Sequence, residues 1–341
     1  MKAAVYRGVQ NIVVEDVPEP VIEPGAVIVK VHSCGICGSD IHSYQRGPRG
    51  GRTDLIPGHE FSGDIVEVGA GITGVKKGDR VVAMSGRSCG ECYWCKRGEI
   101  TRCSKLTMVG LGIPGAFAEY VLVPNFSLGL YAAKLPASLT YEEGATAEPV
   151  AVGYHGVVQI QPKPDDTAVV IGAGFIGLAI IQILKSLGVK QIIASGHRPK
   201  RLQLAKESGA DRVIDGARED IVPIVKEVTG GKGADSVFDV AGTETTFRQA
   251  VQMVRKGGSI DVVGLYGQPF SLSPSAFGGD VSLINCGLRW DLPGAVDLMK
   301  KGKVHAKPLI SHQFPLSQAK EAFDTALGVA DAVKVIVKVR E

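Results

Sequence analysis

Two patterns of apolar residues divide the chain. Residues 2 to about 125 carry short apolar runs broken by glycine and proline, namely AAVYRG, NIVVEDV, AVIVKV, DIVEVG, DRVVAM and AEYVLV. Such runs predict β-strands, so this part should be mostly β. From about Ala168 the runs TAVVI, QIIAS, RVID, SVFDVAG, SIDVVG and SLINC alternate with helical stretches such as Phe175 to Leu187 and Lys200 to Ser208. Strands that alternate with helices predict a parallel, doubly wound sheet of six strands.

Beyond Leu292 the apolar residues return to a helical spacing. Helices are expected from Gly294 to Lys301 and around Ser317 to Leu327, followed by a last strand, VKVIVKV. One hydrophobic core rarely serves much more than about 250 residues, so a chain of 341 residues should form two domains. The expected fold class is therefore α/β, with a mostly β part and a doubly wound part. The turn at Pro162 and Pro164 is a candidate boundary between them.

Composition excludes several classes of protein. The chain is 45% hydrophobic and 21% charged, which is typical of a folded globular protein and not of a disordered one. Its 38 basic and 35 acidic residues leave a net charge of +3, too small to draw it onto nucleic acid or an anionic membrane. Glycines interrupt the apolar stretch from Ala168 to Leu184, which therefore predicts strand, turn and helix instead of a membrane span. The start, MKAAVYRG, has no apolar signal region, so a cytoplasmic location is expected.

A glycine motif follows the first strand of the doubly wound part. The run VVIGAGFIG places Gly172, Gly174 and Gly177, in the pattern GxGxxG, between an apolar strand and a helix. In that context the first glycine permits a tight turn, the second lets a pyrophosphate approach, and the third lets the helix pack closely on the strand. The free N–H groups at the helix N-terminus also favour phosphate. The motif predicts a dinucleotide site, the alternative being a glycine-rich turn without a ligand.

The residues after the second strand bear on which dinucleotide binds. An NAD site usually has an acidic residue there to bind the ribose hydroxyls, but here QIIAS is followed by GHRPKR. A guanidinium suits a 2'-phosphate, so Arg198 and Arg201 favour NADP(H) over NAD(H). The alternative is that these are solvated charges at the start of a surface helix. The other coenzyme contacts expected are Phe175, Ile176, Ser195, Gly196, His197 and Gly264.

The cysteines are grouped in a way that indicates metal binding. Seven is an odd number, and in a chain without an export signal it argues against a disulfide framework. Four of them lie within 15 residues, at the spacing CxxCxxCx7C. Four thiolates can close a tetrahedron around Zn²⁺ with no open position, which predicts a structural zinc; an iron–sulfur cluster or four cysteines without metal are the alternatives. The predicted ligands are Cys89, Cys92, Cys95 and Cys103.

A second group of metal-ligating residues is scattered along the chain. Cys37 lies in CGICGSDIH, His59 and Glu60 lie in PGHEFSG, and Glu148 lies in AEPVAVGYH. A catalytic zinc takes about three protein ligands of mixed type and keeps one position for water or substrate. Spacing alone leaves other interpretations open. A lone histidine beside a glutamate is more often a surface or capped residue, and Cys34 with Cys37 could form a redox pair or half of a thiolate site.

The motifs occur in the order of one known family. With CGICGSDIH, GHEFSGDIVEVGAGI, the four-cysteine segment and GAGFIG, the chain resembles the zinc-containing medium-chain alcohol dehydrogenases over essentially its whole length, in particular their polyol, butanediol and threonine dehydrogenase branch. The resemblance implies a GroES-like catalytic domain at residues 1–152 and 290–341, with a zinc lobe at about 86–104, and a Rossmann domain at residues 153–289. It also implies an active site between the domains and a homo-oligomer, a dimer or tetramer.

The resemblance assigns roles to the second group. Cys37 and His59 match ligands of the catalytic zinc, and Glu60 matches a carboxylate that ligates the metal or exchanges with water. Glu148 stands where simple alcohol dehydrogenases have a third cysteine ligand and where the polyol branch has glutamate. An oxygen donor in place of a thiolate implies a more polar zinc site, with Glu148 bound directly or through water.

Other matches concern the proton, the substrate and the coenzyme. Ser39 and His42 match a proton relay, and Arg289 resembles a substrate-contacting arginine of sorbitol dehydrogenases. The sequence SGHRP resembles the corresponding turn of NADP-dependent secondary alcohol dehydrogenases, which generally lack the four-cysteine lobe. Cys34 and Cys286 match no ligand position and are expected to be packing residues.

The expected activity is hydride transfer between a nicotinamide coenzyme, NADP(H) by preference, and a secondary alcohol, diol or polyol or the matching ketone. Two zinc ions per chain are expected, one catalytic and one structural. The alternative enzyme is an NAD-dependent polyol, butanediol or threonine dehydrogenase. A non-catalytic NADP(H)-binding zinc protein would not need Cys37 or His59, and a zinc-ribbon nucleic-acid binder would need a basic face.

Overall fold

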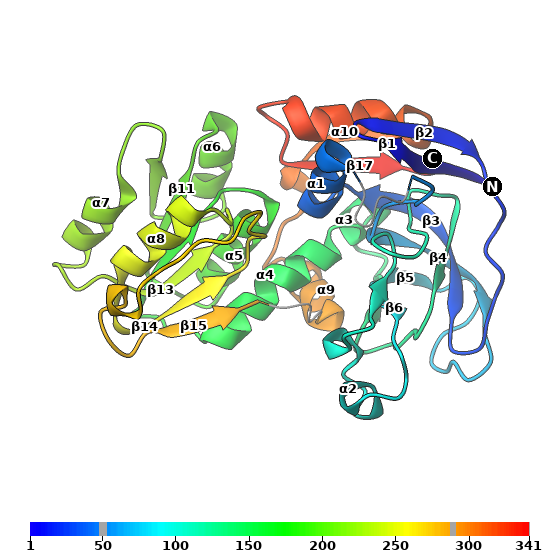
Figure 1. Cartoon of the computed structure of the whole chain (residues 1–341), viewed down its shortest axis with the longest axis horizontal. Coiled ribbons are helices and arrows are strands. Elements are labelled where there is room, and N and C mark those ends of the chain that lie inside the picture. Colours follow the sequence, from blue (N-terminus) through cyan, green and yellow to red (C-terminus); the bar gives the residue numbers. More distant parts are fainter. Residues whose placement is uncertain (48–52, 287–290, 341) are drawn as a thin grey trace. The chain divides into compact units, whose positions relative to one another are not determined.

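The chain forms two compact units (Figure 1). The computed structural model describes residues 1–47, 53–286 and 291–340. Unit 1 comprises Met1–Ala151, Trp290–Lys301 and Ala306–Glu341, and unit 2 comprises Val152–Arg289 and Gly302–His305. Each unit has a β-sheet of its own, so each can be understood from its own packing.

Unit 1 is built mainly from strands. They are β1 Lys2–Gly8, β2 Asn11–Asp16, β3 Val27–Gly35, β4 Glu60–Val68, β5 Arg80–Ala83, β6 Gly86–Arg87, β7 Thr107–Met108, β8 Tyr120–Val123, β9 Ala132–Lys134, β16 Ile310–Pro315 and β17 Lys334–Lys338. Within the described residues, one sheet has seven strands, with the order β16-β17-β3-β4-β5-β9 and with β8 paired to β3. The helices are α1 Gly38–Arg46, α2 Tyr93–Lys96, α3 Tyr141–Gly144, α9 Leu292–Lys300 and α10 Ala319–Gly328, and α4 Ala147–Ile160 begins here.

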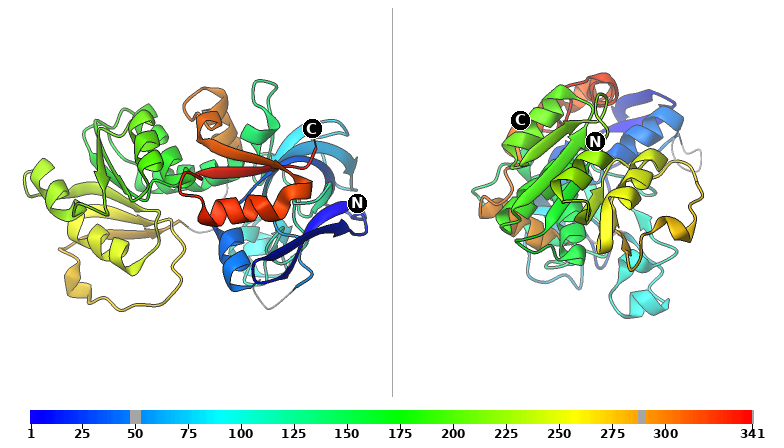
Figure 2. Two further views of the ribbon diagram at one scale, coloured as in Figure 1. Left: turned by 90° about the horizontal axis from the view of Figure 1, so that it is seen from above. Right: turned by 90° about the vertical axis from the view of Figure 1, so that its left-hand side faces the viewer.

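Aromatic rings join the layers of unit 1. Phe323 of α10 is fully buried and meets the rings of Tyr6, Tyr44 and Phe117 at centroid distances of 6.2, 5.2 and 5.3 Å. These rings come from β1, α1 and the segment before β8, so α10 covers the core that the apolar strand runs create. Figure 2 shows α10, in red, lying beside β16 and β17 and next to the β1–β2 hairpin.

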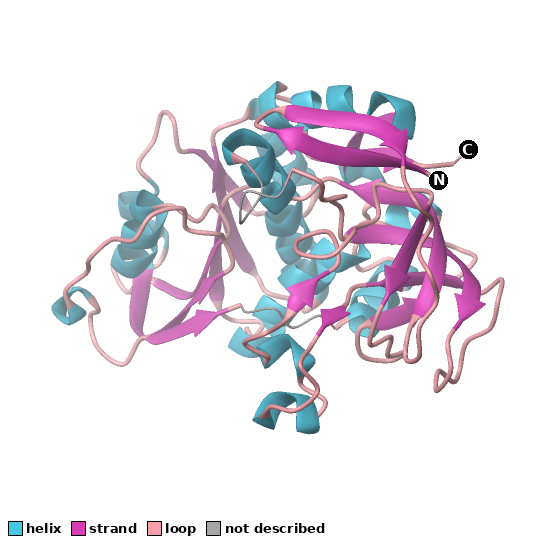
Figure 3. Cartoon of the chain, turned by 45° about the vertical axis from the view of Figure 1, so that its right-hand side comes forward, coloured by secondary structure: helices cyan, strands magenta, loops and turns pink. Residues whose placement is uncertain are grey.

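Unit 2 is a doubly wound α/β structure. Its strands are β10 Thr167–Ile171, β11 Gln191–Gly196, β12 Arg212–Asp215, β13 Ala234–Asp239, β14 Val254–Val262 and β15 Ser282–Asn285, and its helices are α5 Phe175–Ser186, α6 Pro199–Glu207, α7 Ile221–Val228 and α8 Glu244–Met253. Within the described residues the six strands are all parallel, in the order β12-β11-β10-β13-β14-β15. Figure 3 shows these strands in magenta with helices packed against them. The predicted α/β class and six-stranded parallel sheet are confirmed.

The apolar runs of unit 2 are explained by burial on both faces of the sheet. Val169 and Ile171 of β10 belong to a buried cluster that also contains Ile221 of α7 and Phe247 of α8. The intervening Val170 contacts the other layer, near Gly177 of α5. Alternate side chains of one strand thus meet helices on opposite faces, which is why parallel strands are apolar throughout. Among the described residues, no helix has both the length and the apolar character needed to cross a membrane.

One buried carboxylate departs from this apolar pattern. Asp261 of β14 is fully buried, and neither of its carboxylate oxygens has a hydrogen-bond partner among the described residues. It faces Gly156 of α4, where an added Cβ would lie 2.1 Å from Oδ2. Burial raises the pKa of Asp261 to about 7, because the charged form loses its hydration there.

Asp261 should make the stability of the protein depend on pH. Since the folded-state pKa lies above the ordinary value of 3.8, the folded state holds the proton more tightly, and stability falls as pH rises from about 4 to about 7. We expect Asp261→Asn to remove roughly 2–4 kcal/mol of this loss. Urea unfolding at pH 5 and pH 8 measures it. An equal pH dependence in the wild type and the variant would contradict the expectation.

Candidate active site

The glycine motif forms a tight turn between β10 and α5. Gly172 has a φ of +107°, which side-chain-bearing residues rarely adopt, and Gly174 is the N-cap residue of α5. A Cβ on Gly177 would lie 2.0 Å from the carbonyl oxygen of Gly172, so only glycine lets the helix pack this closely. The turn lies next to β13, at the point where the strand order reverses, which is where doubly wound sheets bind dinucleotides.

The basic cluster lies beside this turn. Arg198 is the N-cap residue of α6, and Nη1 of Arg201 lies 4.0 Å from where a Cβ on Gly174 would stand. Burial, followed by the charge of Arg198, lowers the pKa of Arg201 to about 10. Ser195 is buried at the end of β11, while His197 is exposed. Two guanidinium groups that approach each other favour an anion between them, so the residues present fit a phosphorylated nucleotide.

The second group of metal-ligating residues converges in unit 1. Cys37 is the N-cap residue of α1, and His59 and Glu60 lie at the start of β4. One ligand atom from each lies within 4.8 Å of the others. Glu148, in the first turn of α4, is 7% exposed and is not part of this cluster, although its charge acts on His59. The donors are sulfur, nitrogen and oxygen, a set that suits zinc with a position left open.

The pKa of His59 in this cluster depends on the charged groups buried around it. His59 is 3% exposed, and burial alone would lower its pKa. The nearby Cys37 and Asp40 outweigh burial and hold the pKa of His59 well above its ordinary value. Nδ1 of His59 has no hydrogen-bond partner among the described residues. A buried histidine in an anionic setting with an unsatisfied nitrogen fits a metal cation.

Two further residues of the site were not found from the sequence. Asp40 is 1% exposed, accepts a hydrogen bond from the Cys37 N–H at 3.1 Å and lies 3.9 Å from Nδ1 of His59. Lys334 of β17 is also buried, and its Nζ lies 2.6 Å from Oε2 of Glu60 and 3.1 Å from the Ile36 carbonyl oxygen. The spacing of Cys37 and Asp40 carried a signal for Asp40, because it is that of a capping box.

The two relay residues lie on α1. Ser39 Oγ is buried and lacks a hydrogen-bond partner within the described part of the chain, whereas the side chain of His42 is exposed. Their spacing of three residues puts them on neighbouring positions of one helix face. The Ser39 hydroxyl is thus shielded from solvent, whereas the imidazole of His42 is open to it.

The four cysteines of the lobe also come together. The Sγ–Sγ distances are 3.8 Å for Cys89–Cys95, 3.4 Å for Cys92–Cys95 and 3.6 Å for Cys89–Cys103. Zn–S bonds of about 2.3 Å in a tetrahedron require Sγ–Sγ distances of about 3.8 Å, so the four thiols fit zinc. Hydrogen bonds from the N–H groups of Glu91 and Cys92 lower the pKa of Cys89 to about 6, which favours the thiolate that a metal needs.

The remaining predicted residues have different outcomes. Arg289 lies outside the described residues. Cys34 is fully buried in the core of unit 1, and Cys286 donates from its thiol to the Val152 carbonyl oxygen at 3.3 Å. Gly264 lies beside Gly242 in unit 2.

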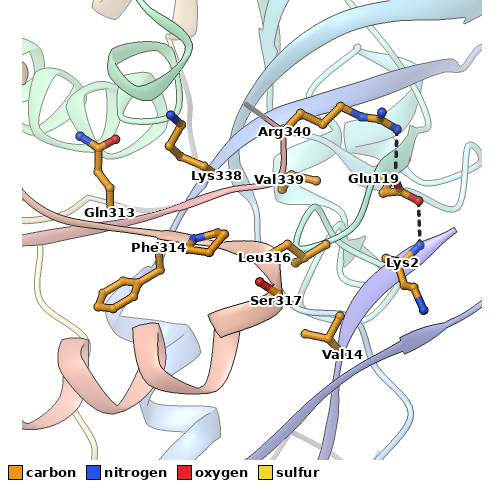
Figure 4. Close-up of a pocket in the computed structure, with 11 residues that line it drawn as sticks. Lys2, Val14, Glu119, Gln313, Phe314, Leu316, Ser317, Lys338, Val339 and Arg340 are labelled. Atoms are coloured by element: carbon orange, nitrogen blue, oxygen red, sulfur yellow. Dashed lines mark hydrogen bonds and ion pairs between the residues drawn. The ribbon is translucent and has the colours of Figure 1, made fainter.

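A surface hollow of about 480 Å³ in unit 1 is a different place (Figure 4). Its lining includes Lys2, Glu119, Phe314 and Arg340, and among the described residues it contains none of the predicted site residues. The Glu119 carboxylate already accepts hydrogen bonds there from the Arg340 guanidinium and from the Lys2 N–H. The hollow is therefore separate from both the metal-ligating cluster and the glycine motif.

Comparison with known proteins agrees with this geometry. Residues 23–137 match the alcohol dehydrogenase GroES-like domain, and residues 176–301 match the zinc-binding dehydrogenase family. The chain is 33% identical to sorbitol dehydrogenase of Bacillus subtilis, over 99% of this chain and 97% of the relative. It is 35% identical to (R,R)-butanediol dehydrogenase of the same organism, over 99% of both chains.

Two solved structures bear on the coenzyme. A zinc-binding dehydrogenase of Sinorhizobium meliloti bound to NADP has a TM-score of 0.89 and 31% identity, with 99% of this chain and 98% of that chain covered. An Escherichia coli alcohol dehydrogenase complexed with NADH has a TM-score of 0.90 and 30% identity, with 99% of both chains covered. Zinc and a nicotinamide coenzyme are thus family features, and the chain belongs to the zinc-containing medium-chain alcohol dehydrogenases, in their polyol dehydrogenase-like branch.

Proposed function

We propose that this alcohol dehydrogenase transfers hydride between NADP(H) and a secondary alcohol, diol or polyol, or the matching ketone, with one catalytic and one structural zinc per chain. The observation that carries the proposal is the convergence of Cys37, His59 and Glu60 on one buried point with ligand atoms within 4.8 Å. In this proposal unit 1 is the catalytic domain and unit 2 binds the coenzyme.

The side chains of unit 1 have separable tasks. Cys37 and His59 bind the catalytic metal, and Glu60 and Glu148 supply oxygen ligands directly or through water. Lys334 holds Glu60 by its 2.6 Å ion pair, and Asp40 places a carboxylate 3.9 Å from Nδ1 of His59. Zinc, when bound, supplies the Lewis acidity that favours the ionised form of a substrate hydroxyl, and the nicotinamide supplies the hydride chemistry.

Ser39 and His42 are proposed to move the proton. The Ser39 hydroxyl accepts the proton of the substrate hydroxyl as it releases its own, and the exposed imidazole of His42 takes up the released proton and gives one to solvent. The difference in exposure between the two side chains supports this direction of transfer. A positioned proton carrier of this kind contributes to the rate without binding the coenzyme.

The coenzyme is proposed to bind at the GxGxxG turn. Gly172, Gly174, Phe175, Ile176 and Gly177 form its phosphate-binding part. The further contacts are Ser195, Gly196, His197, Arg198, Arg201 and Gly264. Arg198 and Arg201 favour NADP(H), since no carboxylate ends β11. The runner-up is an NAD-dependent polyol, butanediol or threonine dehydrogenase. The sorbitol and butanediol dehydrogenase relatives support its substrate class.

The polarity of the metal site supports the substrate class. Glu148, Glu60 and Lys334 surround it with charged groups. A second hydroxyl of a diol or polyol finds partners there, and Arg289 is proposed as another. The chain of a long primary alkanol offers no polar atom to this charged surrounding. We also propose a cytoplasmic homo-oligomer, which reduced cysteines suit.

Substitution of single cysteines should distinguish the roles of the two proposed zinc sites. Cys103→Ser should release the structural zinc and cost several kcal/mol of stability, because the lobe depends on its metal. Cys37→Ser should leave a folded, inactive protein with one zinc. Elemental analysis and thermal unfolding measure both effects. Cys286→Ser, in neither cluster, is the matched control and should retain two zinc ions; one zinc or none in active wild type would refute the proposal.

The coenzyme preference should depend on Arg198. Arg198→Ala should shift the NADP-to-NAD ratio of kcat/KM by roughly 5- to 150-fold toward NAD, the equivalent of about 1–3 kcal/mol for a charged hydrogen bond. Lys200→Ala removes an exposed charge from the same helix start and should change the ratio little. A wild-type enzyme that already prefers NAD would show that the basic cluster is only solvated charge.

The substrate class and the relay can be tested together. In a panel of alcohols assayed with both coenzymes, secondary alcohols or vicinal diols should exceed primary alkanols in kcat/KM. Ser39→Ala should lower the rate by about 10² to 10⁴ and leave coenzyme affinity nearly unchanged. Ser43→Ala on the same helix is the control. The proposal fails if ethanol or hexanol is the best substrate, or if Ser39→Ala keeps most of its activity at neutral pH.

A further inference from the structure

A hydrogen-bonded cluster joins the carboxyl ends of β13 and β14, and the reaction described above does not use it. Asp239 ends β13 and is fully buried. Its Oδ1 accepts hydrogen bonds from the N–H groups of Ala241 and Gly242 at 3.1 and 3.2 Å. Its Oδ2 accepts from Thr246 Oγ1 at 2.9 Å and from the Tyr266 hydroxyl. We call Asp239, Thr246 and Tyr266 the Asp239 latch.

The latch fixes the turn at residues 240–243. The N–H groups of Val240 and Ala241 donate to the Ile171 carbonyl oxygen at the end of β10. The carbonyl oxygen of Asp239 in turn accepts from the N–H groups of Val263 and Gly264 at 3.0 and 2.9 Å. The ends of β10, β13 and β14 are thereby tied together through backbone and side-chain bonds at one edge of the sheet.

The turns at this edge are in direct contact. A Cβ on Gly264 would lie 2.4 Å from the Gly242 nitrogen, and one on Gly172 would lie 3.0 Å from the Ala241 nitrogen. The turn at residues 240–243 therefore packs against the glycine motif on one side and against the turn after β14 on the other. A shift of this turn would move both neighbours.

The packing of the Tyr266 ring holds its hydroxyl in place. The ring lies 6.1 Å from that of Phe247, nearly perpendicular to it, and 5.7 Å from that of Phe270. Phe247 belongs to α8, whose N-terminal turn also carries Thr246. Because the ring has apolar partners of its own, removing only the hydroxyl leaves this packing intact.

In doubly wound sheets the coenzyme lies across the carboxyl ends of the strands at the switch point, with one mononucleotide on each half of the sheet. The half with β10 and β11 carries the glycine motif and Arg198, which suit the adenosine part. The half with β13 and β14 then takes the nicotinamide part. We propose that the Asp239 latch positions the turn at residues 240–243 for the nicotinamide half of the coenzyme. This inference rests on the proposed dinucleotide site but not on the preference for NADP(H).

Tyr266→Phe tests the inference through binding to the purified enzyme. The latch is preorganised in the free protein, so its loss should weaken NADPH binding by about 10-fold, the equivalent of one hydrogen bond to a charged group. Binding of 2',5'-ADP, which contains only the adenosine half, should change less than about twofold. Fluorescence titration gives both dissociation constants, and NADH with ADP repeats the comparison without the 2'-phosphate. Failure of the NADP preference is therefore distinguishable from failure of the latch.

Two further variants make the result decisive. Asp239→Asn keeps the shape of the side chain but changes the acceptor, and it should show the same selective loss. Tyr141→Phe removes a tyrosine hydroxyl from Asp64 in unit 1, an equivalent change at 2.5 Å, and should leave both dissociation constants unchanged. Unchanged NADPH and NADH binding in Tyr266→Phe, or equal weakening of the whole coenzyme and its adenosine half, overturns the proposal. A lower melting temperature with unaltered binding would likewise show a merely structural role.

Discussion

The burial of several ionisable groups at one point is the constraint on which unit 1 depends. Asp40, His59 and Glu60 are each at most 3% exposed, and an unpaired charge buried in this way costs several kcal/mol. Lys334 provides one compensating cation through its ion pair with Glu60. It can do so only because β17, near the end of the chain, pairs antiparallel with β3. The charge balance of the proposed metal site therefore depends on the order of the strands in the sheet.

The site proposed in unit 2 is built from different groups. The proposed coenzyme site has backbone N–H groups, a helix N-terminus and two arginines in place of a buried cluster of charges. A parallel sheet places the turns after its strands at the same edge. The topology of the sheet is therefore enough to make short local motifs neighbours. The latch around Asp239 adds side-chain bonds to this arrangement, and it engages both oxygens of a buried carboxylate with hydrogen-bond donors.

In the cysteine lobe, the proposed structural zinc would take the place of a hydrophobic core. Helix α2 has no buried residue, and Cys95 within it and Cys92 at its N-cap are only partly buried. Such a segment cannot gain enough apolar burial to hold one conformation, whereas four thiolates around a metal can. Tyr131 connects the lobe to the rest of unit 1 by donating to the Gly98 carbonyl oxygen at 3.0 Å.

The features that the sequence determined by itself are those encoded over short distances. Apolar strand runs, the GxGxxG turn and the four closely spaced cysteines each carry their own signal, so the six-stranded sheet and the family followed from them. Helix α1 was not predicted, although its capping box at Cys37 and Asp40 is encoded locally.

Only the tertiary structure decided which distant side chains meet. Lys334 and Glu60 are 274 positions apart, and Tyr266 and Asp239 are 27 apart on different strand ends. Nothing in the local pattern marks Lys334, since a lysine in a terminal strand is ordinarily exposed. Its partner is fixed by strand pairing and by the cost of leaving a buried charge unpaired, and both arise only when the whole sheet has formed.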